Sequence, residues 1–226
     1  MTDETKAAPR LIEAGANPLP RSRYGQPGYM LAKRCFDVVF AAVGLIVLFP
    51  VFLIVGLLIA AKDGFPVIYR HRRVGRNNEP IYVLKFRSMV KNADEVLKKD
   101  PELYAEFLKS FKLENDPRIT KIGSFIRKTS LDELPQLLNV IAGDMSLVGP
   151  RPIVPDELER YGDRQDVYLA MIPGCAGLWQ CSGRSETSYE ERVQLDVDYY
   201  GSASFWTDLK ILGSTMVAIC RRDGAK

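Results

Sequence analysis

The stretch Val38–Ala61, VVFAAVGLIVLFPVFLIVGLLIAA, contains 24 consecutive residues without a charged side chain. As a straight α-helix it would extend about 36 Å, enough to cross the roughly 30 Å hydrocarbon core of a bilayer. Pro50 lies near its middle, where it removes one backbone donor and collides with the carbonyl of Ile46. The arms on either side would each extend only about 18–21 Å. The stretch therefore predicts a membrane helix that is interrupted at Pro50.

Basic residues flank this apolar run on both sides. Residues 1–35 contain six Lys and Arg, and residues 62–91 contain eight, against two acidic residues in that second segment. Because basic flanks favour the cytoplasmic side of a membrane, both ends are expected to lie there. We therefore favour a re-entrant helix over residues 31–61, with a spanning helix as the alternative. Asp37 at its mouth is expected to pair with Lys33 or Arg34.

Composition narrows the class of protein further. With 226 residues, 46% of them hydrophobic, the chain can form one domain of ordinary size with appendages. A net charge of +3 is too small to indicate nucleic-acid binding, and His71, as the single histidine, excludes a multi-histidine metal site. Residues 1–30 are expected to be a flexible tail without a signal peptide. The cysteines lack C-x-x-C spacing and are expected to be buried thiols: Cys35, Cys175, Cys181 and Cys220.

Residues 62–226 are expected to form a cytoplasmic catalytic domain, so that the fold class is α+β and mainly helical. Two β-branched and aromatic segments, Val67–Arg73 and Pro80–Phe86, flank turn residues Gly75–Asn78 and predict a basic β-hairpin. A helix over 92–113, interrupted at Asp100-Pro101, should follow it. For the last helix, Phe205–Cys220, we favour packing in the core over a place in the membrane interface.

An acidic pair follows a cluster of bases. Arg118, Lys121, Arg127 and Lys128 precede Ser130-Leu-Asp132-Glu133, where an apolar helical run begins that ends at Gly143. Either Ser130, in a capping box with Glu133, or Asp132 could cap this helix, and acidic residues there are ordinary helix stabilisers. The alternative is functional: a helix N-terminus and bases suit phosphates and keep Asp132 ionised as a nucleophile, while Glu133 holds Mg²⁺.

Three further motifs carry weaker signals. Arg151 lies on the stiff turn Gly149–Pro152, and the glycine-rich loop from Pro173 ends at Arg184; both suit phosphate contacts. Asp196-Val-Asp198 could be a nucleotide-sugar metal motif. On the helix expected over residues 185–200, however, carboxylates at positions i and i+2 diverge.

These motifs occur in a recognisable order. A membrane run after Lys-Arg-x-Phe-Asp is followed by Lys85-Phe-Arg-Ser-Met89, the Ser130–Asn139 segment SLDELPQLLN, the Gly143–Pro152 segment GDMSLVGPRP, and Gly177-Leu-Trp-Gln-Cys-Ser-Gly-Arg184. Over residues 31–222 the chain resembles the bacterial sugar transferases, the small monotopic polyprenyl-phosphate phosphoglycosyl transferases.

The resemblance implies a re-entrant helix-break-helix on the cytoplasmic face of a bacterial inner membrane. It implies that Asp132 attacks the sugar-bearing phosphate of a UDP-hexose, glucose or galactose, and releases UMP. Undecaprenyl phosphate then accepts the phosphosugar, the first membrane step of exopolysaccharide or O-antigen synthesis. Glu133 would bind Mg²⁺. Whether the protein forms a homodimer is left undecided by the resemblance. The residues implied in phosphate or nucleotide binding are Lys85, Arg87, Arg127, Arg151, Arg184 and Gln180.

Two positions depart from the family pattern: Phe49 stands where many members have serine before the membrane proline, and Ala176 replaces a usual threonine. Two alternatives also stay open. One is a UDP-releasing glycosyltransferase that uses Asp196 and Asp198. The other is a catalytically silent membrane adaptor in polysaccharide assembly. The residues do not distinguish glucose from galactose.

Overall fold

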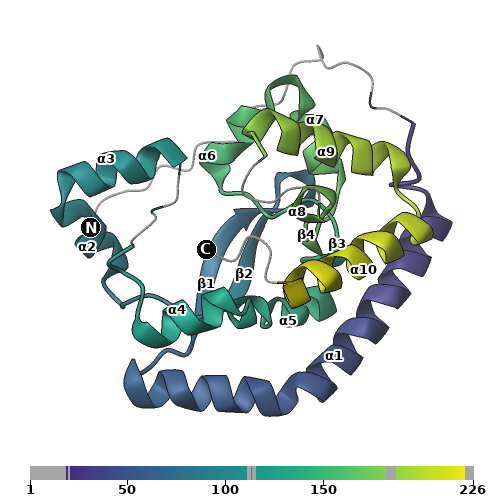
Figure 1. Ribbon diagram of the computed structural model, residues 1–226. Coiled ribbons are helices and arrows are strands. Elements are labelled where there is room, and N and C mark those ends of the chain that lie inside the picture. The colour runs from purple at the N-terminus through teal and green to yellow at the C-terminus, as the bar shows by residue number, and fades with distance from the viewer. Residues whose placement is uncertain (1–18, 20, 111–112, 114–115, 182–186, 222–226) are drawn as a thin grey trace, which may run out of the picture.

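The fold is built on one long apolar helix. The computed structural model describes residue 19 and residues 21–110, 113, 116–181 and 187–221. Helix α1, Pro27–Lys62, is continuous through Pro50, so the predicted interruption there is wrong. Instead, Figure 1 shows that α1 changes direction partway along its length. A proline inside a helix removes one hydrogen bond and bends the axis, and neighbouring turns hold the helix together. Its 36 residues and composition would allow it to cross a membrane.

Both halves of α1 pack against the rest of the protein. Asp37 and Ala41 are buried in the first half, and Val55 and Ile59 in the second. In between, Gly44 lies against Leu137, since a Cβ on Gly44 would be 3.3 Å from that side chain. The opposite side of the helix is apolar and exposed, with Ile46, Val47, Phe49, Ile54 and Leu57 all more than half exposed. Figure 1 shows that the helix lies along the body of the protein. Its exposed side chains therefore form an apolar outer surface.

The predicted basic hairpin is confirmed. Strands β1, Ile68–Val74, and β2, Pro80–Phe86, pair antiparallel around a 3-10 turn in which Asn77 and Asn78 have positive φ. Asparagine tolerates this backbone region better than most residues. In the register Tyr69 lies opposite Lys85 and His71 opposite Val83. Because cross-strand partners share a face, the hairpin presents a mainly polar face that includes Tyr69, His71, Arg73 and Lys85.

Short helices connect the hairpin to the rest of the domain. The interruption at Pro101 is confirmed, and it separates α2, Ala93–Lys99, from α3, Pro101–Ser110. Thr120 caps α4, Lys121–Lys128, by accepting a hydrogen bond from the Gly123 N–H. Helix α5, Gln136–Ala142, ends at Gly143 as predicted, because that glycine has φ +97°.

Two very short strands close the domain. Strand β3, Ser146–Val148, pairs in parallel with β4, Gly174–Ala176. The connection between them contains α6, Pro155–Leu158, and α7, Gln165–Ala170. The backbones approach so closely that a Cβ on Gly174 would lie 2.1 Å from the Gly149 nitrogen. Only glycine fits at such a contact.

Three helices complete the C-terminal part of the domain, and the last of them packs against α1. They are α8, Leu178–Cys181, α9, Tyr189–Ser202, and α10, Phe205–Arg221. The start of α9 has a capping box formed by Ser188 and Glu191. Helix α10 buries Ile211, as a core helix would, but Trp206 on its other side is 69% exposed. The core prediction for this helix therefore holds for one face only.

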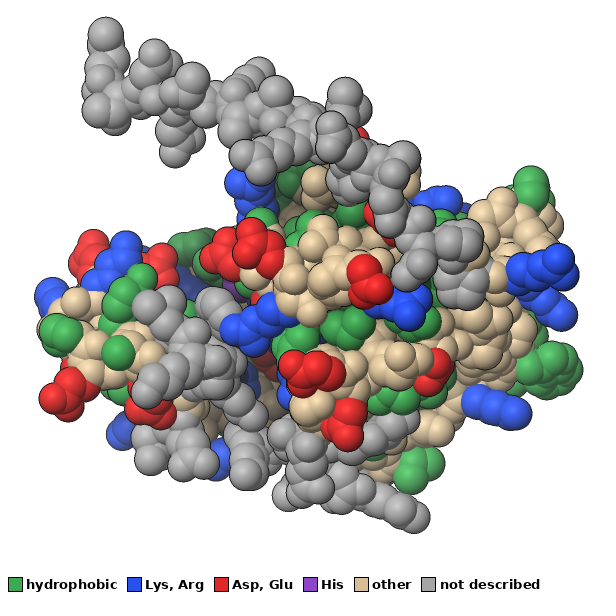
Figure 2. Space-filling model, turned by 90° about the horizontal axis from the view of Figure 1, so that it is seen from above, with side chains coloured by type: hydrophobic (Ala, Val, Ile, Leu, Met, Phe, Trp, Pro, Cys, Tyr) green, Lys and Arg blue, Asp and Glu red, His purple; other side chains and the backbone are tan. Residues whose placement is uncertain are grey.

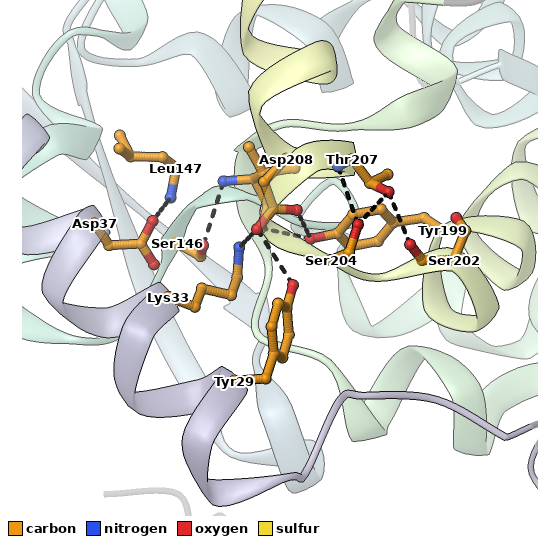
Figure 3. Close-up of polar contacts among 11 residues, drawn as sticks. Tyr29, Lys33, Asp37, Ser146, Leu147, Tyr199, Ser202, Ser204, Thr207 and Asp208 are labelled. Atoms are coloured by element: carbon orange, nitrogen blue, oxygen red, sulfur yellow. Dashed lines mark hydrogen bonds and ion pairs between the residues drawn. The ribbon is translucent and has the colours of Figure 1, made fainter.

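A buried polar network joins α1 to α10 and β3 (Figure 3). The Lys33 ammonium contacts the Asp208 carboxylate at 2.8 Å, and the Tyr199 hydroxyl donates to the same carboxylate at 2.7 Å. Asp37 accepts the Leu147 N–H at 3.0 Å. Lys33 thus forms its ion pair with Asp208. The Arg34 guanidinium donates to the backbone carbonyls of Val140 and Ile141 and so caps the end of α5. The expected ion pair of Asp37 with Lys33 or Arg34 is therefore wrong.

Two further predictions need correction. The expected tail of residues 1–30 overlaps ordered structure, since α1 begins at Pro27 and Tyr24 is buried between Tyr199 and Tyr200. Cys35 is exposed rather than buried, because it lies on the outer side of α1. Cys175 and Cys181 are partly buried free thiols, and the side chain of Cys220 lies outside the described residues.

The face opposite α1 is polar. Figure 2, seen from above with respect to Figure 1, shows acidic and basic side chains next to one another over this face, with only small apolar areas between them. The exposed apolar side chains of α1 lie on the other side of the body. The molecule is therefore amphipathic as a whole.

Candidate active site

The acidic pair lies on a turn of its own. Leu131–Glu133 forms a single 3-10 turn, which we call the dyad turn, and Ser130 before it has φ +56° in the left-handed region. Neither Ser130 nor Asp132 acts as a side-chain cap, so both capping predictions are wrong. The reason is Pro135, which occupies the cap position of α5 and so separates the dyad turn from that helix.

Glu133 faces the hairpin. The Lys85 ammonium on β2 contacts its carboxylate at 2.6 Å. The side chain of Asn139 fixes β2 to α5 beside this pair: its oxygen accepts the Leu84 N–H at 2.9 Å and its nitrogen donates to the Tyr82 carbonyl at 2.8 Å. Because Asn139 is buried, these bonds hold Lys85 and the dyad turn in a defined geometry.

The two carboxylates have shifted pKa values in opposite directions. Burial, followed by the charge of Glu133, raises the pKa of Asp132 to about 6, although Lys85 and Arg127 oppose this. Burial acts in the same direction on Glu133, but Lys85 and Arg151 outweigh it and lower the pKa of Glu133. Because a pKa of about 6 lies below 7, Asp132 can still ionise at neutral pH. Paired carboxylates with separated pKa values are typical of catalytic sites.

A small pocket, partly open to solvent, lies beside Glu133. Among the described residues, its charged lining is mostly basic, with three cations and one carboxylate, and its apolar side chains are Val83, Pro152 and Cys175. The lining residues are Arg73, Val83, Lys85, Glu133, Gln136, Arg151, Pro152, Gly174, Cys175 and Gln180. Such a lining suits a ligand with phosphate groups.

The structure brings together four of the predicted residues, Lys85, Glu133, Arg151 and Gln180, in this pocket. Asp132 is adjacent on the dyad turn, and Arg127 is close enough for its charge to lower the pKa of Asp132. Arg87 is not among the lining residues: its guanidinium donates to the backbone carbonyls of Asp63 and Gly64 at the end of α1. Arg184 lies outside the described residues.

The other six lining residues were not predicted as site residues: Arg73, Val83, Gln136, Pro152, Gly174 and Cys175. The signal for Arg73 was present in the sequence, because the period of two along β1 places Arg73 on the same face as Lys85 in the paired strand. The thiol of Cys175 has a pKa raised far above its usual range by burial, which makes it unreactive.

Asp196 and Asp198 do not form a site. Asp196 is buried and accepts a hydrogen bond from the Tyr161 hydroxyl at 2.8 Å, whereas Asp198 is exposed and contacts Gln194. Their side chains diverge on α9, as the sequence spacing predicts. The glycosyltransferase alternative therefore lacks its metal ligands.

The acidic pair would suit a magnesium ion whose coordination shell is completed by water and by phosphate oxygens of a substrate. Within the described part of the chain, no three His, Cys, Asp or Glu side chains form a group that could hold a metal by themselves. Mg²⁺ in phosphoryl-transfer sites usually takes only one or two carboxylates and completes its shell with water and substrate phosphate oxygens. The adjacent carboxylates of Asp132 and Glu133 match that requirement.

The departures from the family pattern lie away from the pocket. Ala176 is buried in the core on β4 and does not line the pocket, so a hydroxyl there would meet core side chains instead of a nucleotide. Phe49 is 63% exposed on the outer side of α1.

Comparison with known proteins identifies a family for this chain. The chain belongs to the bacterial sugar transferase family, whose model matches residues 28–222. It is 53% identical over 197 residues to the undecaprenyl-phosphate galactose phosphotransferase of Salmonella typhimurium, an alignment that covers 85% of this chain and 41% of the relative. It is 47% identical over 199 residues to the exopolysaccharide production protein ExoY of Rhizobium meliloti, with 86% and 88% covered.

A third relative is the UDP-glucose:undecaprenyl-phosphate glucose-1-phosphate transferase of Escherichia coli, 39% identical over 195 residues, with 82% of this chain and 39% of the relative covered. The chain thus spans about two fifths of the enterobacterial relatives but most of ExoY. The shared region contains the apolar helix, the dyad turn and the pocket.

Proposed function

We propose that this protein transfers hexose 1-phosphate from a UDP-hexose to undecaprenyl phosphate and releases UMP. The observation that carries the proposal is the Glu133–Lys85 pair, which lies next to Asp132 on the dyad turn and in a pocket with two further cations, Arg73 and Arg151. The names of the relatives support the substrates, since they contain undecaprenyl phosphate with galactose or with UDP-glucose.

The reaction has two half-reactions. In the first, an Asp132 carboxylate oxygen forms a bond to the sugar-bearing phosphorus while the bond from that phosphorus to the oxygen of the other phosphate breaks, and UMP leaves. In the second, a phosphate oxygen of undecaprenyl phosphate attacks the same phosphorus and the bond to Asp132 breaks. The product is undecaprenyl-diphospho-hexose, and Asp132 returns to its carboxylate form.

The cations and Glu133 would serve these steps electrostatically. Lys85 and Arg151 would bind phosphate oxygens and stabilise the charge that develops on them. Glu133, with its pKa lowered, would stay ionised and hold Mg²⁺. When bound, Mg²⁺ would screen the repulsion between the Asp132 carboxylate and the phosphates. Arg127, near Asp132, favours its ionised form.

Nucleotide release tests the reaction. The purified protein in detergent would receive Mg²⁺, undecaprenyl phosphate and either UDP-galactose or UDP-glucose. UMP release that requires both the lipid phosphate and the metal supports the proposal, and the faster donor identifies the hexose. Release of UDP, or turnover by the Asp132→Asn variant at the original rate, would refute it. If folded protein released neither UMP nor UDP, that result would favour the catalytically silent adaptor.

We also propose that α1 is re-entrant and that the catalytic domain lies on the cytoplasmic face of the inner membrane. Asp37 and Ile59, near opposite ends of α1, are both buried against the same body. A helix that crossed a bilayer would place its ends on opposite sides, and one soluble body could not pack against both. The basic flanks support the cytoplasmic side.

Thiol labelling in sealed inside-out and right-side-out membrane vesicles tests this topology. Cys35, exposed near the start of α1, is one probe, and a cysteine placed at Lys62 at its end is the other, with the remaining three cysteines replaced. A membrane-impermeant maleimide should label both positions in inside-out vesicles only. Labelling of the two positions from opposite sides would establish a spanning helix.

A further inference from the structure

Arg73 is a pocket cation whose ion pair with Glu157 is long. It lines the pocket with its side chain mostly buried, and the nearest carboxylate, Glu157, is 3.8 Å away. That distance is long for an ion pair, and the same Glu157 oxygen already accepts the Val154 N–H at 3.0 Å. Arg151 lies near enough for its charge to oppose that of Arg73, so that burial and Arg151 together lower the pKa of Arg73 to about 10.

Two guanidinium groups held near one another in a partly buried pocket are unfavourable in the free protein. In the part of the chain that the structure describes, the exposed Arg151 side chain has no carboxylate within ion-pair distance. Its guanidinium lies 6.0 Å from the centre of the Trp179 ring, and its backbone carbonyl accepts a hydrogen bond from the Tyr168 hydroxyl. An anion between these two groups would remove their repulsion. Phosphate is the anion whose geometry guanidinium groups match best.

His71 orients the Arg73 guanidinium. Nη2 of Arg73 lies 3.1 Å from Nδ1 of His71, and because arginine can only donate, Nδ1 must accept and carry no proton. His71 is therefore neutral in this arrangement. Burial first, and then the charges of Arg73, Lys85 and Arg151, lower the pKa of His71 to about 4, against a weak opposing effect of Asp94. Tyr69 packs on its ring at 5.7 Å.

We propose that Arg73, held in position by His71, is a further phosphate ligand for the diphosphate of the nucleotide donor. This inference rests on the proposed function and adds a residue pair to it. The donor, and not the lipid phosphate, is favoured because none of the described lining residues comes from α1. They come from the hairpin, the dyad turn, α5, α8, β4 and the loop after β3.

Binding measurements without turnover test the role of Arg73. UDP, inorganic diphosphate and farnesyl phosphate would be titrated calorimetrically into the full chain in detergent. Loss of one charged hydrogen-bond donor should weaken UDP and diphosphate binding about ten- to a hundredfold in Arg73→Ala, with a smaller loss in Arg73→Lys, and leave farnesyl phosphate unaffected. The matched control is Arg72→Ala, on the same strand but on its opposite, exposed face.

The single histidine gives a second readout. Histidine-selective NMR would follow the pKa of His71 with and without UDP. A bound phosphate next to Arg73 should raise this pKa by about one unit, because it offsets the three cations. His71→Phe should weaken UDP binding, and His71→Asn, which retains an acceptor, should restore most of it.

Several outcomes overturn the inference. Unchanged UDP binding in folded Arg73→Ala refutes it, and so does a His71 pKa that does not respond to bound UDP. Equal loss of farnesyl phosphate binding would assign the pair to the lipid substrate instead. Failure of the proposed function is distinguishable, because it appears as missing UMP release in the wild type, whatever the binding data show.

Discussion

At the scale of single residues, Asp132 is in conflict with its surroundings. Its pKa is raised to about 6 by burial and by Glu133, so the folded protein holds the carboxylate in a less favourable environment than the unfolded chain does. The left-handed backbone of Ser130 next to it adds to the same cost. A nucleophile needs such a placement, because a well-solvated or fully paired carboxylate attacks phosphorus poorly.

This conflict predicts that Asp132→Asn is inactive yet more stable. Between pH 4 and pH 6 folded wild type binds more protons than unfolded wild type, so its free energy of unfolding falls as the pH rises through this window. The free energy of unfolding of Asp132→Asn does not fall in this window. Above pH 6 it should exceed that of wild type by about 1–2 kcal/mol, a figure reduced to allow for the partial exposure of Asp132.

Thermal denaturation at pH 4 and pH 7.5 would measure the effect, which should vanish at the lower pH. Asp198→Asn, an exposed position on α9, is the matched control and should change stability at neither pH. A variant less stable than wild type at pH 7.5 would contradict the assigned environment of Asp132.

The sequence was sufficient to select Asp132, Glu133 and Lys85 as candidates, because their motifs are long, and the structure brings Lys85 into contact with Glu133; their catalytic roles stay predictions. It was not sufficient for the geometry around them. Pro135 moves the start of α5 past the acidic pair, and whether a Ser-x-x-Glu pattern forms a capping box depends on backbone angles that only the folded chain shows. Arg87 also follows the motif, yet the structure places it against the carbonyls at the end of α1.

At the scale of elements, the contact between β2 and α5 determines the geometry of the site. It depends on Asn139, whose buried amide satisfies both the Leu84 N–H and the Tyr82 carbonyl. Asn139→Ala would leave these two backbone groups without partners, and we expect a destabilisation of about 2–4 kcal/mol. The Lys85–Glu133 pair should also become less well ordered. The rate of UMP release should therefore fall by more than the decrease in the fraction of folded protein.

Chemical denaturation and single-turnover UMP release, both below the unfolding transition, would separate the two effects. Gln194→Ala, where an exposed amide contacts only an exposed carboxylate on α9, serves as a control of similar chemistry. Unchanged stability in Asn139→Ala would show that β2 does not depend on this amide.

The parallel contact of β3 and β4 gives a second prediction at this scale. Gly174→Ala would place a Cβ 2.1 Å from the Gly149 nitrogen and 2.6 Å from the Val148 carbonyl carbon, so the two strands must separate. We expect a loss of more than about 3 kcal/mol and of the pocket wall that Gly174 and Cys175 form.

Gly213→Ala is the matched control, because a Cβ at this exposed position on α10 would meet no atom within 4 Å. That variant should gain up to about 1 kcal/mol from helix propensity. Circular dichroism melting curves would measure both variants, and equal stability of the two would refute the close approach.

The β-hairpin, the break between α2 and α3 at Pro101 and the long apolar helix α1 were predictable from the sequence. Alternation, the position of a proline and uninterrupted hydrophobicity are local signals. The pairing of three-residue β3 with β4 was not, since 25 residues intervene between Val148 and Gly174 and neither strand has a periodic pattern. Whether Pro50 interrupts or bends α1 also depends on its packing partners.

At the scale of the whole molecule, the Lys33–Asp208 pair joins the first half of α1 to α10. Asp208→Asn would leave the Lys33 ammonium buried without a counter-charge, which should cost about 3–5 kcal/mol. The Tyr199 hydroxyl could still donate to the new amide oxygen, so the loss would report mainly on the ion pair. The double change Lys33→Met with Asp208→Asn, which keeps an acceptor for Tyr199, should recover most of the stability.

Unfolding in detergent, followed by Trp206 fluorescence on α10, would measure the loss. Near-zero coupling between the two positions in a double-mutant cycle would show that the helices do not depend on this pair.

The packing of α1 has a practical consequence for preparing the protein. Membrane anchors are often removed to obtain a water-soluble catalytic fragment. Here the same helix covers Leu137, Phe86 and Ile126 from the outside, and its Lys33 and Arg34 satisfy groups on α10 and α5. A fragment that starts after Lys62 would therefore lose part of its own hydrophobic core and expose the rest. Solubility has to come from detergent, nanodiscs or polar substitutions on the outer side of α1, such as at Ile46 or Val47.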